Sequence, residues 1–351
     1  MPDPSDTLAP YGWNDRVAAL VATAEEEATA PAGTLPGRVA RVAYDRVTVV
    51  TPGGTVTARA HDLPAVGDWV LVAPPDAEGG DRRVVALVPR WSSLERVAND
   101  GTVQTMAADV DIVLVVTGLD RGPNWNRLDR ELVLAWESGA VPVVVFNKAD
   151  VRDDVPTLLA DAADRLPGVD VLVTSVVTGE GLAALRELAA PDRTIVFLGA
   201  SGVGKSSLVN VLVGTEVLDV GPVRPDDHRG RHTTTARELV PLPGGGVLLD
   251  TPGVRSLGLG EAHEGLASAF ADIEALAEGC RFRDCAHEAE PGCAVRAAVV
   301  AGEIPERRFE SWTKLRDEMA WSASREDPAA AAARRREWRI VSKAARKLPK
   351  R

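Results

Sequence analysis

Residues 194–208, which read TIVFLGASGVGKSSL, constrain the fold of this chain more than any other stretch. The segment 199–206 fits G-x-x-x-x-G-K-[ST], a loop whose backbone N–H groups cradle phosphates between a strand and a helix. The apolar run 194–198 before it predicts a buried strand. Lys205 would reach the β- and γ-phosphates, and Ser206 would hold Mg²⁺. The predicted phosphate-binding residues are Gly199, Ala200, Ser201, Gly202, Val203, Gly204, Lys205, Ser206 and Ser207.

A second motif indicates which base the nucleotide carries. Asn147, Lys148 and Asp150 form N-K-x-D directly after the apolar run 141–146, at the carboxyl end of a predicted strand, where open α/β sheets bind ligands. A carboxylate there can accept two parallel hydrogen bonds from guanine N1–H and the 2-amino group, which adenine does not offer. Thr174 and Ser175 follow another apolar strand and are similar to the loop behind guanine in GTPases.

Two further segments suit the γ-phosphate and its metal. Asp250 and Gly253 form D-x-x-G after a short strand, which predicts a carboxylate that supports Mg²⁺ and a glycine that senses the γ-phosphate. A threonine in the run 233–235 would close on Mg²⁺; Thr234 is our candidate, although the sequence does not choose among the three. Val254 stands where many GTPases carry a water-orienting glutamine, so slow intrinsic hydrolysis is expected; His232 is a weaker catalytic candidate.

The order of these motifs is unusual. The base-reading elements at Asn147 and Ser175 precede the phosphate loop at Gly199, and D-x-x-G follows it. A circular permutation can build the same sheet from this order, because the termini of compact domains often lie close together. We therefore predict an α/β fold with a permuted GTPase domain over residues 110–260, with helices near 125–138, 157–166 and 182–190.

The flanking regions differ in composition. Residues 1–32 are rich in proline and alanine, and we expect a mobile arm with one short helix over 13–23. Residues 33–90 contain about five short Val/Thr-rich runs separated by turns, which predicts a small barrel such as an OB-fold. A plain packing module is the alternative. Residues 91–109 are interpreted as a connector.

All three cysteines lie within one short segment. Cys280, Cys285, His287 and Cys293 form C-x4-C-x-H-x5-C. Three thiolates and one imidazole make a closed tetrahedral Zn²⁺ site, which is structural because no ligand position remains for water. We assign residues 261–333 to a zinc-binding helical domain.

Charge is distributed unevenly. The whole chain has a formal net charge of −11, yet residues 334–351 carry nine Lys/Arg and one acidic residue. This basic tail suits contact with nucleic-acid phosphates, and a solvated disordered segment is the alternative. The sequence has no run of 18 apolar residues and no apolar leader after a basic start, so we expect a cytoplasmic protein without a membrane partner.

Taken together, these segments resemble the RsgA/YjeQ family of ribosome small-subunit-dependent GTPases. The resemblance rests on the two nucleotide motifs, on GRHTTT at 230–235, on DTPGVR at 250–255 and on the cysteine cluster. It implies an OB-fold, a permuted GTPase domain and a zinc domain. It also implies GTP/GDP with Mg²⁺ as the nucleotide, and binding to the 30S subunit and its 16S rRNA late in maturation, by a chain that is expected to be a monomer.

Two other functions remain open on the sequence. The same parts would suit a translation-factor or RNA-remodelling GTPase that acts on another RNA. They would also suit a zinc-stabilised RNA-binding protein whose nucleotide site is only a structural latch.

Overall fold

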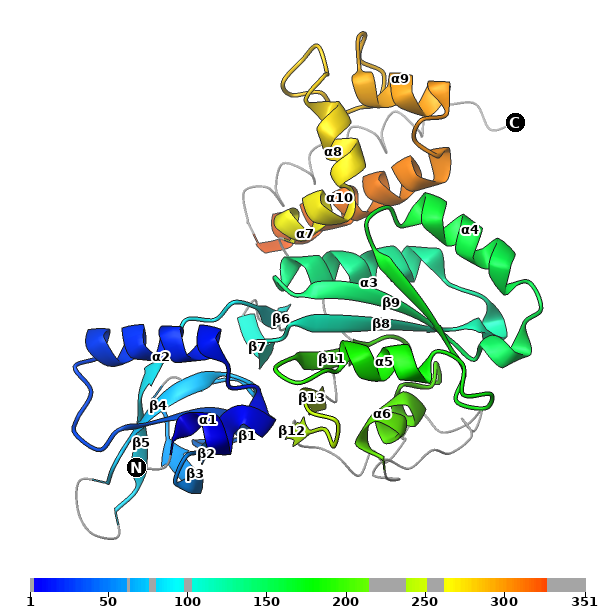
Figure 1. Cartoon of the computed structure of the whole chain (residues 1–351). Helices are drawn as coiled ribbons and strands as arrows, with labels where there is room; N and C mark the ends of the chain where they lie inside the picture. The colour runs from blue at the N-terminus through cyan, green and yellow to red at the C-terminus, as the bar shows by residue number, and fades with distance from the viewer. Residues whose placement is uncertain are drawn as a thin grey trace.

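The computed structural model describes residues 3–61, 64–75, 80–97, 103–214, 238–250 and 262–326. Three parts follow one another along the chain: an N-terminal barrel, a central sheet covered by helices, and a C-terminal group of helices (Figure 1). Thr234, Gly253, Val254 and His232 lie outside the described residues, as does the basic tail. Within the described ranges, no helix is both long and apolar enough to cross a membrane.

The N-terminal part is a closed five-stranded barrel. Its strands follow the order β1-β2-β3-β5-β4, and β4 returns to pair with β1. The β3–β5 pairing is parallel and the other pairings are antiparallel, which is the topology of an OB-fold. The expected barrel is therefore confirmed. The strands are β1 (Leu35–Ala43), β2 (Arg46–Thr51), β3 (Gly54–Arg59), β4 (Trp69–Ala73) and β5 (Arg82–Leu87).

Residues 3–30 are ordered against this barrel, so the expected mobile arm is wrong. Helix α2 begins after Asn14, whose side chain accepts a hydrogen bond from Val17 N, a standard N-cap. Val17 and Val21 are buried beside Trp69 of the barrel. Their four-residue spacing places them on one helix face. The elements are α1 (Pro4–Leu8), η1 (Ala9–Tyr11) and α2 (Asp15–Glu27).

The predicted connector contains a β-hairpin. Strands β6 (Ser93–Val97) and β7 (Val103–Ala108) pair antiparallel and lead into the central sheet. Leu94 and Met106 of this hairpin are buried in the same apolar core as the central sheet. The hairpin therefore belongs to the packed body of the protein.

The central sheet has the strand order β10-β9-β8-β11-β13-β12, parallel except for β12. The central strand β11, which carries the phosphate loop, comes after β8, β9 and β10 in sequence, as the predicted permutation requires. The strands are β8 (Ile112–Gly118), β9 (Val141–Asn147), β10 (Asp170–Thr174), β11 (Thr194–Leu198), β12 (Glu238–Pro241) and β13 (Val247–Asp250).

Helices cover both faces of this sheet. Val113 and Val115 of β8 pack with α3 and α4 on one face, whereas Leu114 and Val116 pack with α5 and α6 on the other. This alternation is the two-residue period of a strand that is buried on both sides. The helices are α3 (Trp125–Glu137), α4 (Val155–Arg165), α5 (Leu182–Leu188) and α6 (Lys205–Val213), with short 3₁₀ turns η2 (Leu119–Arg121) and η3 (Ala149–Val151).

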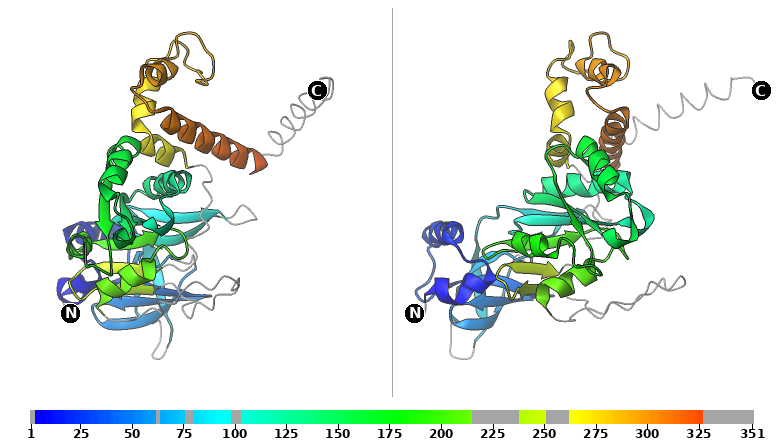
Figure 2. Two further views of the ribbon diagram at one scale, coloured as in Figure 1. Left: turned by 90° about the vertical axis from the view of Figure 1, so that its right-hand side faces the viewer. Right: turned by 45° about the vertical axis from the view of Figure 1, so that its right-hand side comes forward.

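Four helices form the C-terminal part and lie over α3, on the side of the sheet away from the barrel (Figures 1 and 2). Arg308 of α10 fastens them together, since its guanidinium pairs with Asp272 and donates to the carbonyls of Arg165 and Ala269. Ser311 Oγ donates to Asp129 Oδ2 of α3. The helices are α7 (His263–Ala269), α8 (Ala271–Ala277), α9 (Ala294–Ala301) and α10 (Glu306–Glu326).

A buried arginine joins the barrel to the central sheet. Arg38 of β1 is 1% exposed. Its guanidinium donates to Tyr11 O, to Gly67 O at 3.0 Å, to Asp109 O at 3.1 Å and to Thr194 Oγ1 at 2.8 Å. These acceptors belong to four different segments. Burial lowers the pKa of Arg38 to about 10, which leaves the group charged at neutral pH.

Candidate nucleotide site and metal centre

The phosphate loop turns between β11 and α6 as the sequence predicts. Gly199, Gly202 and Gly204 all have φ between +82° and +136°, a region that L side chains rarely adopt. Space is short as well, because a Cβ at Gly199 would lie 2.2 Å from Val116 O. Lys205, the first residue of α6, donates to Gly199 O at 2.8 Å and to Ala200 O at 2.6 Å. A bound phosphate would compete with these carbonyls for the ammonium group.

Direct hydrogen bonds connect the N-K-x-D loop to the phosphate loop. Asn147 Nδ2 donates to Val203 O at 2.9 Å, and Lys148 Nζ donates to Gly202 O at 2.7 Å. Lys148 adopts a left-handed backbone conformation with φ of 63°, which turns the chain sharply at the end of β9. Two motifs that lie far apart in the sequence therefore form one surface at the carboxyl edge of the sheet.

The residues after β10 support this surface from behind. Thr174 Oγ1 donates to Asn147 Oδ1 at 3.1 Å, and Ser175 Oγ donates to Asp150 Oδ1. Ser175 Oγ also accepts hydrogen bonds from Val177 N and Thr178 N, both at 3.2 Å. The carboxylate of Asp150 is thus oriented by a hydroxyl that is itself fixed by the following turn.

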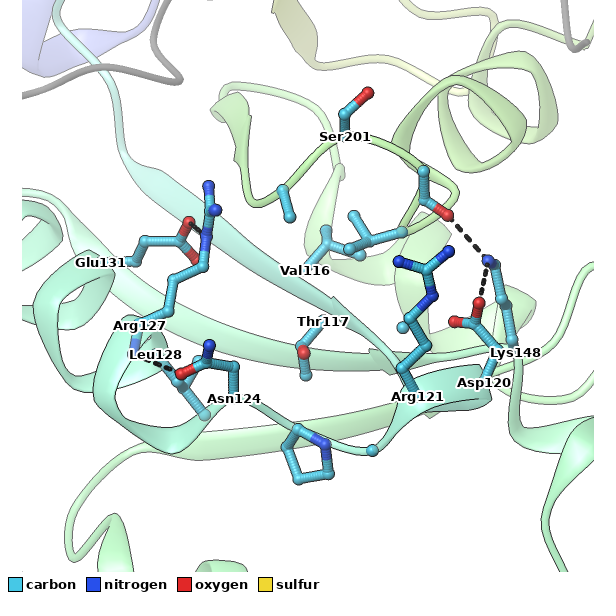
Figure 3. A pocket seen from close by; sticks show the side chains of 16 residues that line it. Val116, Thr117, Asp120, Arg121, Asn124, Arg127, Leu128, Glu131, Lys148 and Ser201 are labelled. Carbon is cyan, nitrogen blue, oxygen red and sulfur yellow. Dashed lines mark hydrogen bonds and ion pairs between the residues drawn. The ribbon is translucent and has the colours of Figure 1, made fainter. Parts of the chain in front are cut away.

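A cavity of about 730 Å³ lies beside the phosphate loop (Figure 3). It is lined by the end of β8, the turn η2, the first turns of α3 and residues Ala200–Val203. Arg127 Nε donates to Glu131 Oε1 at 2.8 Å across its wall, and burial raises the pKa of Glu131 above its ordinary value. No sequence motif marks Asp120, Arg127 or Glu131, because only the adjacency of β8 and β11 brings them to the loop.

Three further residues are predicted to lie near the γ-phosphate and its metal ion. Asp250 ends β13, which is the parallel neighbour of β11, so its backbone lies at the edge of the sheet that carries the phosphate loop. Thr234 and Gly253 lie outside the described residues.

The predicted metal ligands converge in the C-terminal part. The ligand atoms of Cys280, Cys285, His287 and Cys293 all lie within 4.8 Å of one another. Individual separations are 3.9 Å between the sulfurs of Cys280 and Cys293, and 3.4 Å from His287 Nδ1 to the latter. Zinc–sulfur bonds of about 2.3 Å and a zinc–nitrogen bond of about 2.0 Å give tetrahedral edges of about 3.5–3.8 Å. The four groups therefore fit a single zinc ion.

Neighbouring groups hold these ligands in place. Cys293 is the N-cap of α9, and its sulfur accepts a hydrogen bond from Arg296 N at 3.4 Å. His287 packs edge-on against Trp312 of α10, with ring centroids 5.4 Å apart. The cluster is thus connected to the helix that packs on α3.

Comparison with known proteins identifies the family. The family described as RsgA GTPase matches residues 87–260. A "Small ribosomal subunit biogenesis GTPase RsgA" of Streptomyces avermitilis is 44% identical over 348 residues, which cover 95% of this chain and 92% of the relative. The chain belongs to the RsgA GTPase family. A Streptomyces coelicolor relative of the same name is also 44% identical, over 345 residues.

Solved structures of similar proteins confirm the expected fold. YjeQ from Thermotoga maritima aligns with a TM-score of 0.62 at 26% identity, covering 82% of this chain and 99% of that one. YloQ, described as a circularly permuted GTPase, aligns with a TM-score of 0.61 at 24% identity, covering 82% and 96%. As a member of the RsgA GTPase family, the chain is a GTP-hydrolysing enzyme. The resemblance inferred from the sequence is therefore correct.

Proposed function

We propose that this chain hydrolyses GTP while it assists late maturation of the small ribosomal subunit. The printed names of its relatives support this role. The enzymatic part of the proposal rests on two hydrogen bonds, which Asn147 and Lys148 of the guanine-reading loop donate to carbonyls of the phosphate loop. An arrangement of this kind suits one nucleotide that spans both loops.

Each motif has a proposed task in this reaction. Asp150 reads guanine, and Thr174 and Ser175 hold the base-reading loop in shape. The backbone of residues 199–207 cradles the phosphates, and Lys205 neutralises charge on the β- and γ-phosphates. Ser206 and Asp250, with Thr234, would hold Mg²⁺, which stabilises the negative charge that develops on the transferred phosphoryl group. Gly253 would sense the γ-phosphate.

The Cys₃His cluster is proposed to hold one structural zinc ion. Four protein ligands complete its coordination, so the ion would stabilise the fold of residues 280–293 and leave no position for substrate. The adjacent surface has an exposed Phe282 with Arg281 over its ring, 5.4 Å from guanidinium carbon to centroid. An exposed ring between basic residues suits stacking on an unpaired base.

The proposed partners are the 30S subunit and its 16S rRNA, met in the cytoplasm by a monomer of this chain. The barrel, the zinc-cluster surface and the basic tail would supply the RNA contacts. A GTPase that acts on another RNA is the competing function, whereas the latch is set aside because the chain belongs to a family of GTP-hydrolysing enzymes.

One experiment tests the proposal against this competitor. GTP turnover by the full-length protein is measured alone, with isolated 30S subunits, with 50S subunits and with tRNA. Strong stimulation by 30S subunits only is expected, with Lys205→Ala inactive in every mixture. Equal stimulation by 50S subunits or tRNA would favour another RNA, and turnover that 30S subunits leave unchanged would contradict the proposal.

A further inference from the structure

The lysine of the N-K-x-D loop has a second partner beside the phosphate loop. Lys148 Nζ lies 3.2 Å from Asp120 Oδ2 while it donates to Gly202 O (Figure 3). Asp120 belongs to η2, directly after β8, and is in neither nucleotide motif. One ammonium group therefore joins three segments: the loop after β8, the loop after β9 and the phosphate loop after β11.

The backbone around Asp120 is shaped to admit this contact. A Cβ at Gly118 would lie 2.7 Å from Asp120 Oδ1 and 3.3 Å from the Cα of Val203. Any side chain at Gly118 would therefore displace either the carboxylate or the phosphate loop. Gly118 leaves room for Asp120 to turn back toward the end of β9.

Among the described residues, neither arginine of the neighbouring cavity replaces Lys148 as the partner of Asp120. Arg127 is engaged with Glu131 of the same helix. Arg121 points into the cavity, but no ion pair between it and Asp120 is present among the described residues. Lys148 is thus the cation that Asp120 meets, and both side chains are about one-third exposed.

We propose that Asp120 is a positioning residue for nucleotide binding, acting through Lys148. It holds the lysine across the phosphate loop, so that the base-reading and phosphate-binding loops keep the spacing that one nucleotide requires. This inference rests on the guanine site proposed above. Because the contact lies at Gly202, away from the γ-phosphate lysine Lys205, it supports GDP and GTP equally.

The test measures affinity and turnover separately in the full-length protein. Asp120→Asn keeps the size of the side chain and removes its charge. The Kd values of fluorescent GDP and of a non-hydrolysable GTP analogue should rise together by about threefold to tenfold, as for a partly exposed ion pair whose partner bridges two loops. The kcat at saturating GTP should stay within about twofold, and Asp120→Glu should restore binding.

Two controls separate positioning from general stability. Asp154→Asn removes a comparable exposed carboxylate, paired with Arg152 near the same loop but away from residues 199–206, and should leave both Kd values unchanged. The Asp120→Asn effect should also shrink in high salt, because salt screens an exposed ion pair, whereas a purely structural defect would persist.

Combination with Lys148→Ala decides among the outcomes. If Lys148→Ala binds GDP as well as the wild type does, the proposed guanine site is itself wrong. If Lys148→Ala weakens binding but Asp120→Asn does not, only the positioning role is overturned. If the two residues are coupled, the double variant must lose less affinity than the product of the two separate fold-losses. The positioning role is therefore also overturned if the fold-losses of affinity of the two single variants multiply in the double variant.

Discussion

The carboxylate that we propose for base selection has its orientation set by a neighbouring hydroxyl. Asp150 accepts a hydrogen bond from Ser175 Oγ, and that hydroxyl receives two backbone N–H groups in turn. The remaining acceptor capacity of the carboxylate suits the paired donors of guanine. The choice of base can therefore be tested by one substitution, which replaces a carboxylate oxygen of Asp150 by an amide nitrogen.

We expect Asp150→Asn to weaken GTP binding by about ten- to a hundredfold, because hydrogen bonds to a charged acceptor are lost. Xanthine nucleotides should bind better than they do to the wild type, since xanthine presents an oxygen where guanine presents its amino group. Competition of GTP and XTP against a fluorescent nucleotide measures both effects. An unchanged preference for GTP would contradict the role of Asp150.

A second residue-scale feature is the carboxyl group of Asp109, buried where the barrel meets the sheet. Trp91 N donates to its Oδ1 at 3.3 Å, while its Oδ2 has no hydrogen-bond partner among the described residues. Burial raises the pKa of Asp109 to about 7, against the attraction of Arg38 and with a smaller contribution from Asp68. Asp111, whose pKa burial also raises, accepts a hydrogen bond from Thr194 N nearby.

This raised pKa predicts the direction in which stability changes with pH. Between pH 3.8 and about 7 the folded protein binds a proton at Asp109 that the unfolded chain does not. The contribution of Asp109 to the free energy of unfolding therefore falls as pH rises through that window. Asp109→Asn should remove this contribution, and asparagine also tolerates the φ of 56° at this position.

Urea unfolding at about pH 5 and about pH 7.5 measures the difference for both proteins. The pKa of Asp111 is shifted in the same direction, and this residue remains in both proteins. Only the difference between the two proteins in the slope of the free energy of unfolding against pH is therefore assigned to Asp109. A slope that is the same in the variant and the wild type would contradict the prediction.

At the scale of elements, the sequence predicts the positions of helices and strands most reliably where apolar runs are long. The strands and helices of the central sheet lie close to their expected ranges, because segments such as 112–118 and 194–198 are buried on both faces. The hairpin β6–β7 was not predicted. Polar residues such as Glu95 and Gln104 interrupt its pattern, and buried residues such as Leu94 and Met106 gain partners from the distant sheet.

The N-terminal helix was predicted over 13–23 and lies at Asp15–Glu27, but its order was misjudged for a similar reason. Its apolar face is narrow and depends on the indole of Trp69 from another element. The nucleotide motifs were predictable because the chemistry of phosphate and guanine restricts residues to fixed spacings. Asp120 follows no such spacing, and its place beside Lys148 comes from strand order alone.

Among the elements, the Cys₃His cluster is the one whose stability we expect to depend most on a bound ion. Cys285→Ser should release zinc and loosen residues 280–293, because metal binding contributes folding free energy that this short loop does not gain from a large core. Metal analysis of the purified variant and hydrogen exchange over this segment measure the two effects. GDP affinity serves as the control and should be retained; wild-type protein purified without zinc would refute the assignment.

At the scale of the whole molecule, two buried arginines connect the parts. Arg308 fastens the C-terminal helices, and Arg38 fastens the barrel to the first residue of β11, the strand that ends in the phosphate loop. A buried charge that donates to several carbonyls leaves those acceptors unsatisfied when it is removed. The barrel is thus held to the strand that leads directly to the nucleotide.

We expect Arg38→Met to lower the free energy of unfolding by about 3–5 kcal/mol, as when one partner of a buried polar network is deleted. The barrel should also unfold separately from the sheet, which calorimetry would record as two transitions. Arg41→Met in the same strand is the matched control, because its ion pair with Glu238 is about half exposed and contributes little. A single unshifted transition in Arg38→Met would show that the junction is held by other contacts.

The permuted strand order also determines the order in which the parts of the nucleotide site are synthesised. Domains fold from the N-terminus as they are synthesised. The residues that read the base are therefore made before those that hold the phosphates. Until residues 194–198 emerge, the apolar edge of β8 has no neighbour on that side, and Arg38 has no Thr194 to meet. Unpaired strand edges of this composition are prone to aggregate. A chain that stalls before β11 would expose that edge and lack the phosphate loop, so the segments made after β10 both complete the sheet and supply the phosphate-binding part of the nucleotide site.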